Sequence, residues 1–353
     1  MISRKYTEVV VVPLTAISLA FLAGALFILA IGKNPIDVYG VMLQGTLGTS
    51  YGIGQVLFKS TPLILTGLSV ALAFHAGLFN IGAEGQLNMG ALAMGLMGWW
   101  ITATWPSLSW IIVIPLCLIA GFMGGAVWGF IPGWLKARFG VHEVINTIML
   151  NFISLGIVNY LVMEHFHIPE TIHTPEIGPA AHIPRFDALI PLFSGSPVNA
   201  SLLIALGIIV LSGYLLFRTR LGYEIRALGF NPPAAEYAGI NINRITWVSM
   251  ALSGGIAGMV GMNFILGYKY YFEDGFAGGV GFMGIAVALL GKNHPIGIVL
   301  AALLFGILSQ GGLAINTQVP KDLVEILEAI IILLMVVMTE IFRRRFSHQK
   351  QIK

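Results

Sequence analysis

The polar residues whose spacing is most informative lie in a glycine-rich break in the chain, Leu78-Phe-Asn-Ile-Gly-Ala-Glu-Gly-Gln-Leu-Asn-Met-Gly90. Apolar segments flank it on both sides, and it carries Asn80, Glu84, Gln86 and Asn88. A carboxylate at the centre of a bilayer costs about 2.5–3.5 kcal/mol on insertion scales unless it faces a cavity or a partner. The break is therefore expected to line a route through a membrane.

Other roles remain open for these side chains. Three roles are open to Glu84: binding a substrate, holding a neighbouring span by a hydrogen bond, or carrying protons. We favour a structural or path-lining role over proton transfer. For Asn80, a polar group satisfied inside a helix bundle is as good an explanation as direct contact with a ligand.

The elements that carry this break are membrane spans. The chain has 353 residues, 57% of them hydrophobic and only 10% charged, whereas soluble domains have roughly 25% charged residues. Apolar runs near the ~20 residues that cross a bilayer recur along its length. They predict ten spans, at about Val9–Ile31, Pro62–Phe79, Leu87–Ala103, Ser109–Trp134, Val144–Met163, Ser201–Phe217, Ile245–Gly267, Gly279–Leu290, Pro295–Gln310 and Leu323–Phe342.

The expected fold is a single all-α integral membrane domain over residues 1–353, with spans from about 9 to 342. The backbone groups at an open sheet edge have no hydrogen-bond partners in lipid, so the spans of this chain are expected to be helices. Ten spans place both termini on one side, and most of the 19 Lys and Arg residues fall on that side. The positive-inside rule makes it cytoplasmic.

Two connections are long. Residues 164–199 form an extracytoplasmic loop in which repeated prolines disfavour a long helix, and its irregularly spaced histidines do not predict a metal site. Residues 218–244 form a cytoplasmic loop. Near the C-terminal span, Glu325 and Glu328 share one helical face and are expected at a solvated rim.

A second glycine-rich break, residues 275–284, precedes the eighth span as the first break precedes the third. The two are five spans apart, so the spans enter from opposite sides. Matching breaks in two halves of opposite orientation are typical of inverted repeats with the pathway at their interface. An inverted five-plus-five repeat is therefore expected, although glycine is common in membrane helices anyway.

The cytoplasmic loop contains a short helix signal. Asn231 is a good N-cap, Pro232 suits the first helical position, and Gly239 suits a C-cap. The resulting helix, 232–238, would present small and apolar side chains, namely Ala234, Ala235, Tyr237 and Ala238. Such a helix is suited to docking in a groove of another protein. The alternative, a helix flat on the lipid surface, usually has a strongly basic polar face that this one lacks.

Four segments together resemble a known family. They are Ala-Leu-Gly-Phe-Asn-Pro-Pro-Ala-Ala-Glu-Tyr-Ala-Gly-Ile (227–240), Gly-Leu-Phe-Asn-Ile-Gly-Ala-Glu-Gly-Gln (77–86), Lys-Ala-Arg-Phe-Gly-Val-His-Glu-Val-Ile-Asn-Thr-Ile-Met-Leu-Asn (136–151) and Gly-Phe-Met-Gly-Ile-Ala-Val-Ala-Leu-Leu-Gly (281–291). From about residue 10 to 342 the chain resembles permease subunits of ATP-binding-cassette importers. Within the branch that serves simple sugars, nucleosides and branched-chain amino acids, it is closest to nucleoside permeases of the purine or guanosine type. It departs at Met283, where many relatives have a polar residue.

The resemblance implies two groups of functional residues. The translocation path would include Asn80, Glu84, Gln86, Asn88, Gly279, Phe282 and Met283. Contact with a separate ATPase subunit would involve Arg226, Gly229, Asn231, Ala234, Ala235, Tyr237 and Gly239. No catalytic residue and no metal ligand is expected.

The resemblance also implies partners and a location. They are the ATPase, a second permease that is a paralogue or a copy, an extracytoplasmic substrate-binding lipoprotein, and the lipid of a bacterial cytoplasmic membrane, with no nucleic acid. The sequence has no Gly-x-x-x-x-Gly-Lys-[Ser/Thr] phosphate loop, so ATP and Mg are expected on the ATPase and the chain is expected to be a transport subunit rather than an enzyme.

Two alternatives remain. The first is a permease for simple sugars such as ribose or galactose with the same architecture. The second is an ion-coupled secondary transporter, which the coupling-like loop and the lack of paired membrane carboxylates disfavour.

Overall fold

The computed structural model describes residues 12–187, 190, 193–320, 322, 325, 326, 328–334, 337 and 338. Within these residues the architecture is helical, as the composition predicts. The helices are α2 (Val12–Ala30), α3 (Pro35–Thr46), α4 (Ser50–His75), α5 (Ala83–Thr104), α6 (Trp110–Phe139), α7 (Glu143–Leu161), α8 (Ser201–Arg218), α9 (Arg220–Phe230), α10 (Pro232–Tyr237), α11 (Ile242–Gly258), α12 (Val280–Leu290) and α13 (Pro295–Ile315), with short helical segments η2 (Val162–Phe166), η3 (Pro179–Ala181) and η5 (Met262–Lys269).

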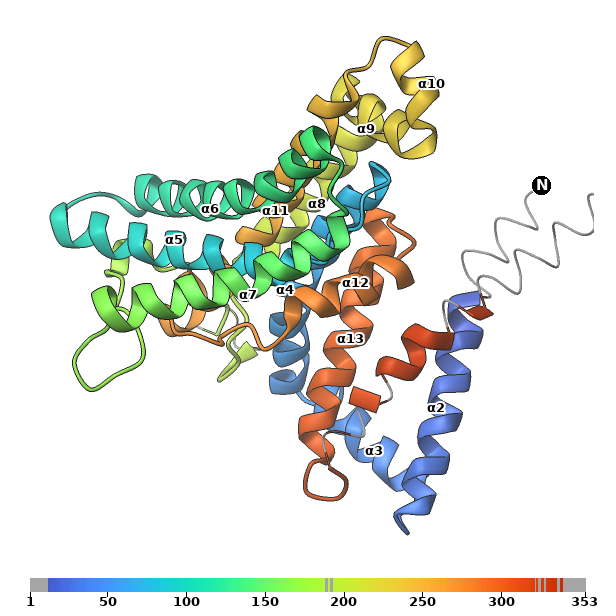
Figure 1. Ribbon diagram of the computed structural model, residues 1–353. Coiled ribbons are helices and arrows are strands. Elements are labelled where there is room, and N and C mark those ends of the chain that lie inside the picture. Colours follow the sequence, from blue (N-terminus) through green and yellow to red (C-terminus); the bar gives the residue numbers. More distant parts are fainter. Residues whose placement is uncertain are drawn as a thin grey trace, which may run out of the picture.

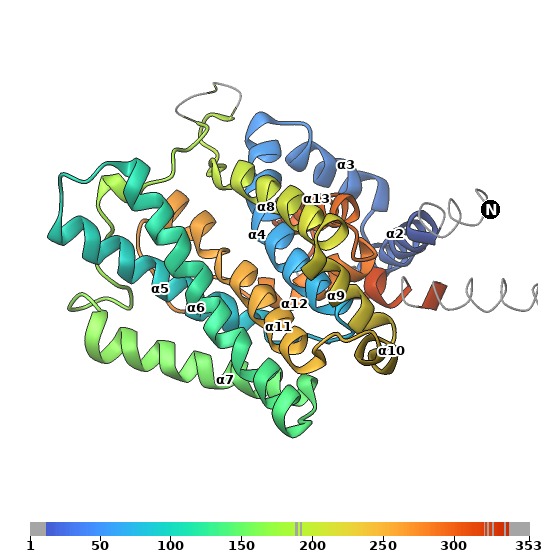
Figure 2. The ribbon, with the colours of Figure 1, turned by 90° about the horizontal axis from the view of Figure 1, so that it is seen from above.

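Helix α4 is the central element of the bundle. It packs against α8, α11, α12 and α13, and Figure 2 shows it enclosed between them. Almost every side chain from Ser60 to Ala73 is buried. Small residues bring α12 and α13 close, since a Cβ at Gly67 would lie 2.6 Å from Val287 and one at Gly306 would lie 2.2 Å from Ser60.

Helices α6 and α11 are joined along a stripe of glycines. A Cβ at Gly125 would lie 2.2 Å from the carbonyl oxygen of Gly254, and one at Gly258 would lie 2.2 Å from that of Gly121. Glycine allows two backbones to approach this closely, which is how small residues favour helix association in membranes. Helix α5 packs beside this pair, and the three run side by side in Figures 1 and 2.

The outer faces of the bundle are apolar and are suited to lipid. Large exposed apolar side chains cover α6, α7 and α8, among them Ile119, Val127, Phe152, Leu203 and Val210, and soluble monomers rarely expose such continuous surfaces. Six of the described helices are long and apolar enough to cross a membrane, or seven if α2 and α3, bent by 117°, count as one span. The chain is therefore a multi-pass membrane protein.

The helices agree with most of the predicted spans, but some boundaries differ. Nine of the ten predicted segments overlap helices among the described residues, and the tenth, 323–342, lies partly outside those residues. Helix α4 begins at Ser50 rather than Pro62, because Thr49 caps its start and Pro62 is accommodated inside the helix. Helix α3, capped by Asn34, was not predicted. Neither was α9, which is capped by Thr219.

The long connection before α8 has no long helix among its described residues, as its prolines predict. It is held to the segment after η5 by ring stacking. The His173 and Tyr271 ring centroids are 4.1 Å apart, and those of His182 and Tyr270 are 3.7 Å apart.

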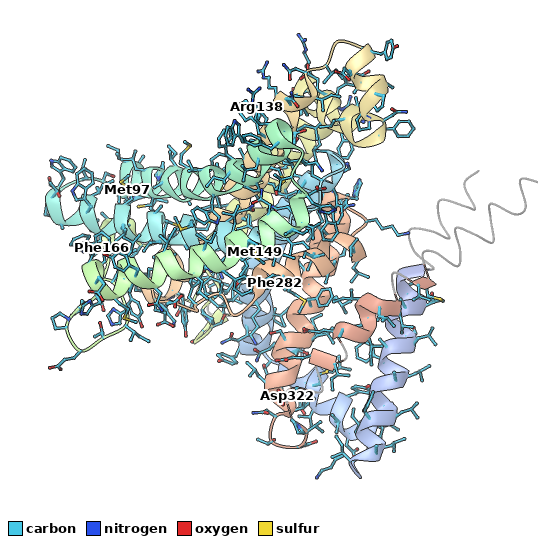
Figure 3. The ribbon with its side chains drawn as sticks, in the orientation of Figure 1. Met97, Arg138, Met149, Phe166, Phe282 and Asp322 are labelled. Atoms are coloured by element: carbon cyan, nitrogen blue, oxygen red, sulfur yellow. The ribbon has the colours of Figure 1, made fainter. Side chains whose placement is uncertain are left out.

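The two ends of the bundle differ in chemistry. Helices α9 and α10 project at one end, and α3 lies at the opposite end (Figure 1). Arg138 lies at the same end as α9 and α10, and Asp322 lies at the other (Figure 3). This places the basic Arg138 at the end that the sequence predicts to face the cytoplasm.

Candidate functional site

Glu84 joins the two glycine-rich breaks. It lies in the first turn of α5. Its Oε1 accepts a hydrogen bond from the backbone N–H of Gly279 at 3.3 Å, and its Oε2 accepts one from that of Gly281 at 2.7 Å. One side chain thus binds the start of α12, almost two hundred residues away in the sequence.

The geometry explains why glycines surround this contact. Gly278 and Gly279 have positive φ angles of 55° and 84°, which residues with a Cβ rarely adopt. A Cβ at Gly281 would lie 2.4 Å from the backbone nitrogen of Glu84. The first N–H groups of a helix lack partners within the helix, and its N-terminus carries partial positive charge. The carboxylate therefore satisfies the start of α12 and lies near the positive ends of two helices.

The first break is held by a buried amide network. Asn80 Nδ2 donates to Gln86 Oε1 and to Ser253 Oγ, both at 2.8 Å, and Gln86 Nε2 donates back to Asn80 Oδ1 at 3.1 Å. Asn80 and Gln86 are each only 1% exposed. Since buried polar groups are stable only when paired, these two side chains fix the shape of the break in this conformation.

Two residues that sequence reasoning did not single out complete the network. Asn151 of α7 accepts a bond from the Gly85 N–H and donates to the Ile81 carbonyl, both at 2.9 Å. Ser253 of α11 bonds Ser69 of α4 as well as Asn80. The feature of the sequence that could have indicated Asn151 is its place as a polar residue at the end of the segment 136–151. For Ser253 it was a hydroxyl inside an apolar span.

The remaining residues predicted for the path have different environments. Asn88 is buried on α5, one turn after Glu84. Phe282, labelled in Figure 3, is 47% exposed at the start of α12. Gly279 and Met283 border a cavity. The structure thus brings Glu84 and Gly279 together, and it places Asn80 and Gln86 in the packing behind them.

The cavity has a volume of about 630 Å³ and lies between α4, α12, α13 and the segment around residues 325–332. Its wall includes Lys59, Ser309 and Glu328 beside apolar residues. Glu328 is only 7% exposed, so its expected place on a solvated rim is wrong. Glu325 is exposed, as predicted. Glu328 instead lines the cavity, and Lys59 of α4 lines the same cavity.

The cytoplasmic loop forms the short helix that its sequence predicts. Asn231 Oδ1 accepts the Ala234 N–H at 3.1 Å at the start of α10, and Gly239 follows the helix with φ 80°. Tyr237 is 97% exposed. Ala235 was expected on the presented face, but it is only 3% exposed, because α10 turns this side toward α9 and α11.

The exposed surface here is larger than α10. Phe230, which the sequence analysis did not include, is 92% exposed. A hollow of about 390 Å³ lies between α9 and α10 and is lined by residues that include Arg226, Phe230, Asn231 and Ala234. Phe230 lines this hollow and Tyr237 is exposed on the neighbouring α10, and aromatic side chains and arginine are common anchors at protein–protein interfaces.

Helix α9 contacts the segment that leads into the first break. A Cβ at Gly229 would lie 2.2 Å from the His75 carbonyl oxygen and 2.7 Å from the Gly77 nitrogen. His75 Nε2 in turn lies 3.0 Å from the Asn293 carbonyl oxygen in the turn between α12 and α13. Helix α9 is therefore in direct contact with the segment that leads into the first break, and through His75 that segment contacts the turn after α12.

Comparison with known proteins identifies the family of this chain. The family model described as "Branched-chain amino acid transport system / permease component" matches residues 52–338. The chain is 40% identical to the nucleoside ABC transporter permease protein NupB of Lactococcus lactis, over 92% of this chain and 90% of that protein. It is 41% identical to the guanosine ABC transporter permease protein NupP of Bacillus subtilis, over 91% of each.

A third relative is named for a different solute. The chain is 36% identical to the glucose ABC transporter permease protein TsgB13 of Haloferax volcanii, over 94% of this chain and 88% of that protein. The family match covers both breaks and the α9–α10 region. The chain therefore belongs to the permease component family of branched-chain amino acid transport systems, as an ABC transporter permease and a transport subunit rather than an enzyme.

Proposed function

We propose that this chain is the permease subunit of an ATP-driven importer of nucleosides, with purine nucleosides such as guanosine as the first candidates. The observation that carries the proposal is the Glu84 bridge between the two breaks, in a chain about 40% identical to permeases named for nucleosides and guanosine. Short helices whose N-termini meet inside a membrane are a common way to build a solute path. The predicted path residues Asn80, Glu84, Gln86, Asn88, Gly279, Phe282 and Met283 belong to this proposal.

A simple-sugar permease is the second candidate function. The glucose permease relative, 36% identical over most of the chain, favours it. The two candidates differ in whether the path must accommodate an aromatic base. Met283 supports the nucleoside, because a soft and polarisable thioether packs well against a ring.

The proposed mechanism begins at α9 and α10. A separate ATPase subunit would contact Arg226, Gly229, Asn231, Ala234, Tyr237 and Gly239, and also the exposed Phe230. The buried Ala235 would stabilise α10 by packing on its inner side. ATP-driven closure of the ATPase would move these helices. The contact of Gly229 with residues 75–77 would carry that motion to the first break, and the contact of His75 with Asn293 would carry it to α12. The change would be a shift between two packed arrangements, not a continuous deformation.

The proposed assembly contains three further components: the ATPase, which would hold ATP and Mg, a second permease, and an extracytoplasmic binding lipoprotein. A paralogous second permease is supported by two weaker relatives, NupC of Lactococcus lactis and NupQ of Bacillus subtilis, 26% and 29% identical, from organisms that also have NupB and NupP. Ten spans in an inverted five-plus-five repeat, cytoplasmic termini and a bacterial cytoplasmic membrane complete the proposal.

The substrate class is tested by uptake of labelled guanosine, adenosine, uridine and ribose in cells with and without the gene. Loss of nucleoside uptake in the deletion strain, restored by the gene, is the expected result. Loss of ribose or glucose uptake alone would transfer the assignment to the sugar branch.

The coupling mechanism predicts the effect of Gly229→Val. The added side chain would clash with the backbone of residues 75–77 and displace α9 from the end of α4. We expect guanosine uptake to fall at least about tenfold, while ATP hydrolysis by the assembled complex loses its stimulation by the binding protein. Gly207→Val is the control, since a Cβ at Gly207 meets no atom within 4 Å. Normal stimulated hydrolysis in the Gly229 variant would contradict the coupling route.

A further inference from the structure

We propose that the cavity between α4, α12 and α13 is a nucleoside-binding site within the translocation path, with Lys59 and Glu328 as its polar contacts. The inference rests on the proposed function and adds a site to it. Neither residue belongs to the glycine-rich breaks, and both come from outside the segments that sequence reasoning assigned to the path.

The size and walls of the cavity fit a small amphipathic solute. Its volume of about 630 Å³ lies within the range of 300–1,000 Å³ that is common for small-molecule sites. The walls include the aromatic rings of Phe58, Phe264 and Phe305 and the thioether of Met283. Such groups offer flat and polarisable contacts to a purine ring.

The polar part of the cavity consists of opposite charges on an otherwise apolar wall. Lys59 Nζ donates to the Ser309 carbonyl oxygen at 3.2 Å, which uses one of the three donors of an ammonium group. The Glu328 carboxylate is buried at the same cavity. Ionisable groups in membrane spans face a cavity or a partner and usually mark a solute pathway.

This combination suits a nucleoside in particular. A nucleoside is neutral, and it has an aromatic base at one end and a ribose with adjacent hydroxyls at the other. A carboxylate accepts hydrogen bonds from hydroxyls, and an ammonium group donates to hydroxyl or ring acceptors. A free sugar satisfies the charged part of the site but leaves the aromatic part without a partner.

The cavity is also connected to the proposed gate. Gly279 lines the cavity and donates its N–H to Glu84. Any displacement of the start of α12 relative to α5 would therefore change the cavity wall at Gly279, Val280 and Met283. A solute held by Lys59 and Glu328 would lie next to the element that the ATPase is proposed to move.

The first test measures guanosine transport and ATP hydrolysis together in proteoliposomes that contain the complete transporter with its binding protein. Lys59→Met and Glu328→Gln remove the charges and keep most of the side-chain volume. We expect each to lower guanosine uptake per ATP hydrolysed at least about fivefold, while the binding protein still stimulates hydrolysis. Lys33→Met and Asp322→Asn are the matched controls, because both side chains are exposed and neither lines the cavity.

The outcomes separate this inference from the proposed function. If the unsubstituted transporter moves no nucleoside, the proposed function fails. If it moves guanosine and both variants match the controls, the cavity site is overturned and the proposed function stands.

A second measurement detects occupancy directly and does not depend on turnover. The only cysteine of the chain, Cys117, is buried, so Ser309→Cys in a Cys117→Ser background provides a single reactive thiol at the cavity. We expect a water-soluble thiol reagent to label it and guanosine to slow the labelling at least about threefold, with little effect from ribose. No protection by guanosine, or access only for lipid-soluble reagents, would show that lipid or the second permease fills the cavity and would overturn the site.

Discussion

Replacement of Glu84 by alanine is expected to reduce transport strongly while leaving the protein in the membrane. The variant removes the acceptor for the N–H groups of Gly279 and Gly281. A buried donor left without a partner costs about 1–3 kcal/mol, so the start of α12 should shift or fray. Because a change of 1.4 kcal/mol corresponds to a factor of ten, we expect guanosine uptake to fall at least about tenfold.

Graded substitutions at Glu84 distinguish the bridge from a proton carrier. Glu84→Gln keeps one acceptor oxygen and should retain more activity than Glu84→Ala, because part of the bridge survives. Asp37→Asn is the control, since Asp37 is also in the first turn of a helix but is exposed. Near-normal uptake by Glu84→Ala would contradict the bridge. Equal loss in the Gln and Ala variants, with transport driven by a proton gradient, would favour the proton carrier.

The largest effect on folding is expected from Gly125→Val. A Cβ at this position would lie 2.2 Å from the Gly254 carbonyl oxygen and 2.8 Å from the Gly258 Cα, and neither backbone atom can move without separating α6 from α11. Overpacking of a closely packed core typically costs about 1–3 kcal/mol. We expect a clash with the backbone of a second span to destabilise the protein by an amount at or above the upper end of that range.

The measurement for Gly125→Val is the amount of protein in the membrane and its melting temperature in detergent. We expect strongly reduced accumulation and a lower melting temperature than that of the unsubstituted protein. Gly207→Val and Gly156→Val test whether valine itself is harmful in an apolar helix, because a Cβ meets no atom within 4 Å at either position. If all three variants behave alike, the glycine stripe does not hold α6 and α11 together.

Local signals made the fold largely predictable. Nine of the ten apolar runs coincide with helices, and six of the described helices, or seven with α2 and α3 as one span, are long and apolar enough to cross a membrane. The cap at Asn231 with Pro232 and Gly239 identified α10 to within one residue. Caps and apolar runs act over a few residues, so one sequence contains them. The start of α4 was misplaced because Pro62 is more often found at the first turn of a helix than inside one.

The partners of the site residues were not predictable in the same way. Glu84 is recognisable in the sequence as a membrane carboxylate, but its bonds to Gly279 and Gly281 depend on the packing of α5 against α12. Ser253 and Asn151 act on the first break from α11 and α7. Glu328 and Ala235 were placed on exposed faces because periodicity defines a helical face without defining what packs against it.

The most direct test of the function uses proteoliposomes that contain this chain, its partner permease, the ATPase and the binding protein. Labelled guanosine is supplied on the side of the membrane where the binding protein acts, and its accumulation on the opposite side is measured. If the chain is the permease of an ATP-driven nucleoside importer, guanosine will accumulate only with hydrolysable ATP, and a proton uncoupler will not prevent it. Accumulation that survives inactivation of the ATPase and collapses with the proton gradient would contradict the proposed function.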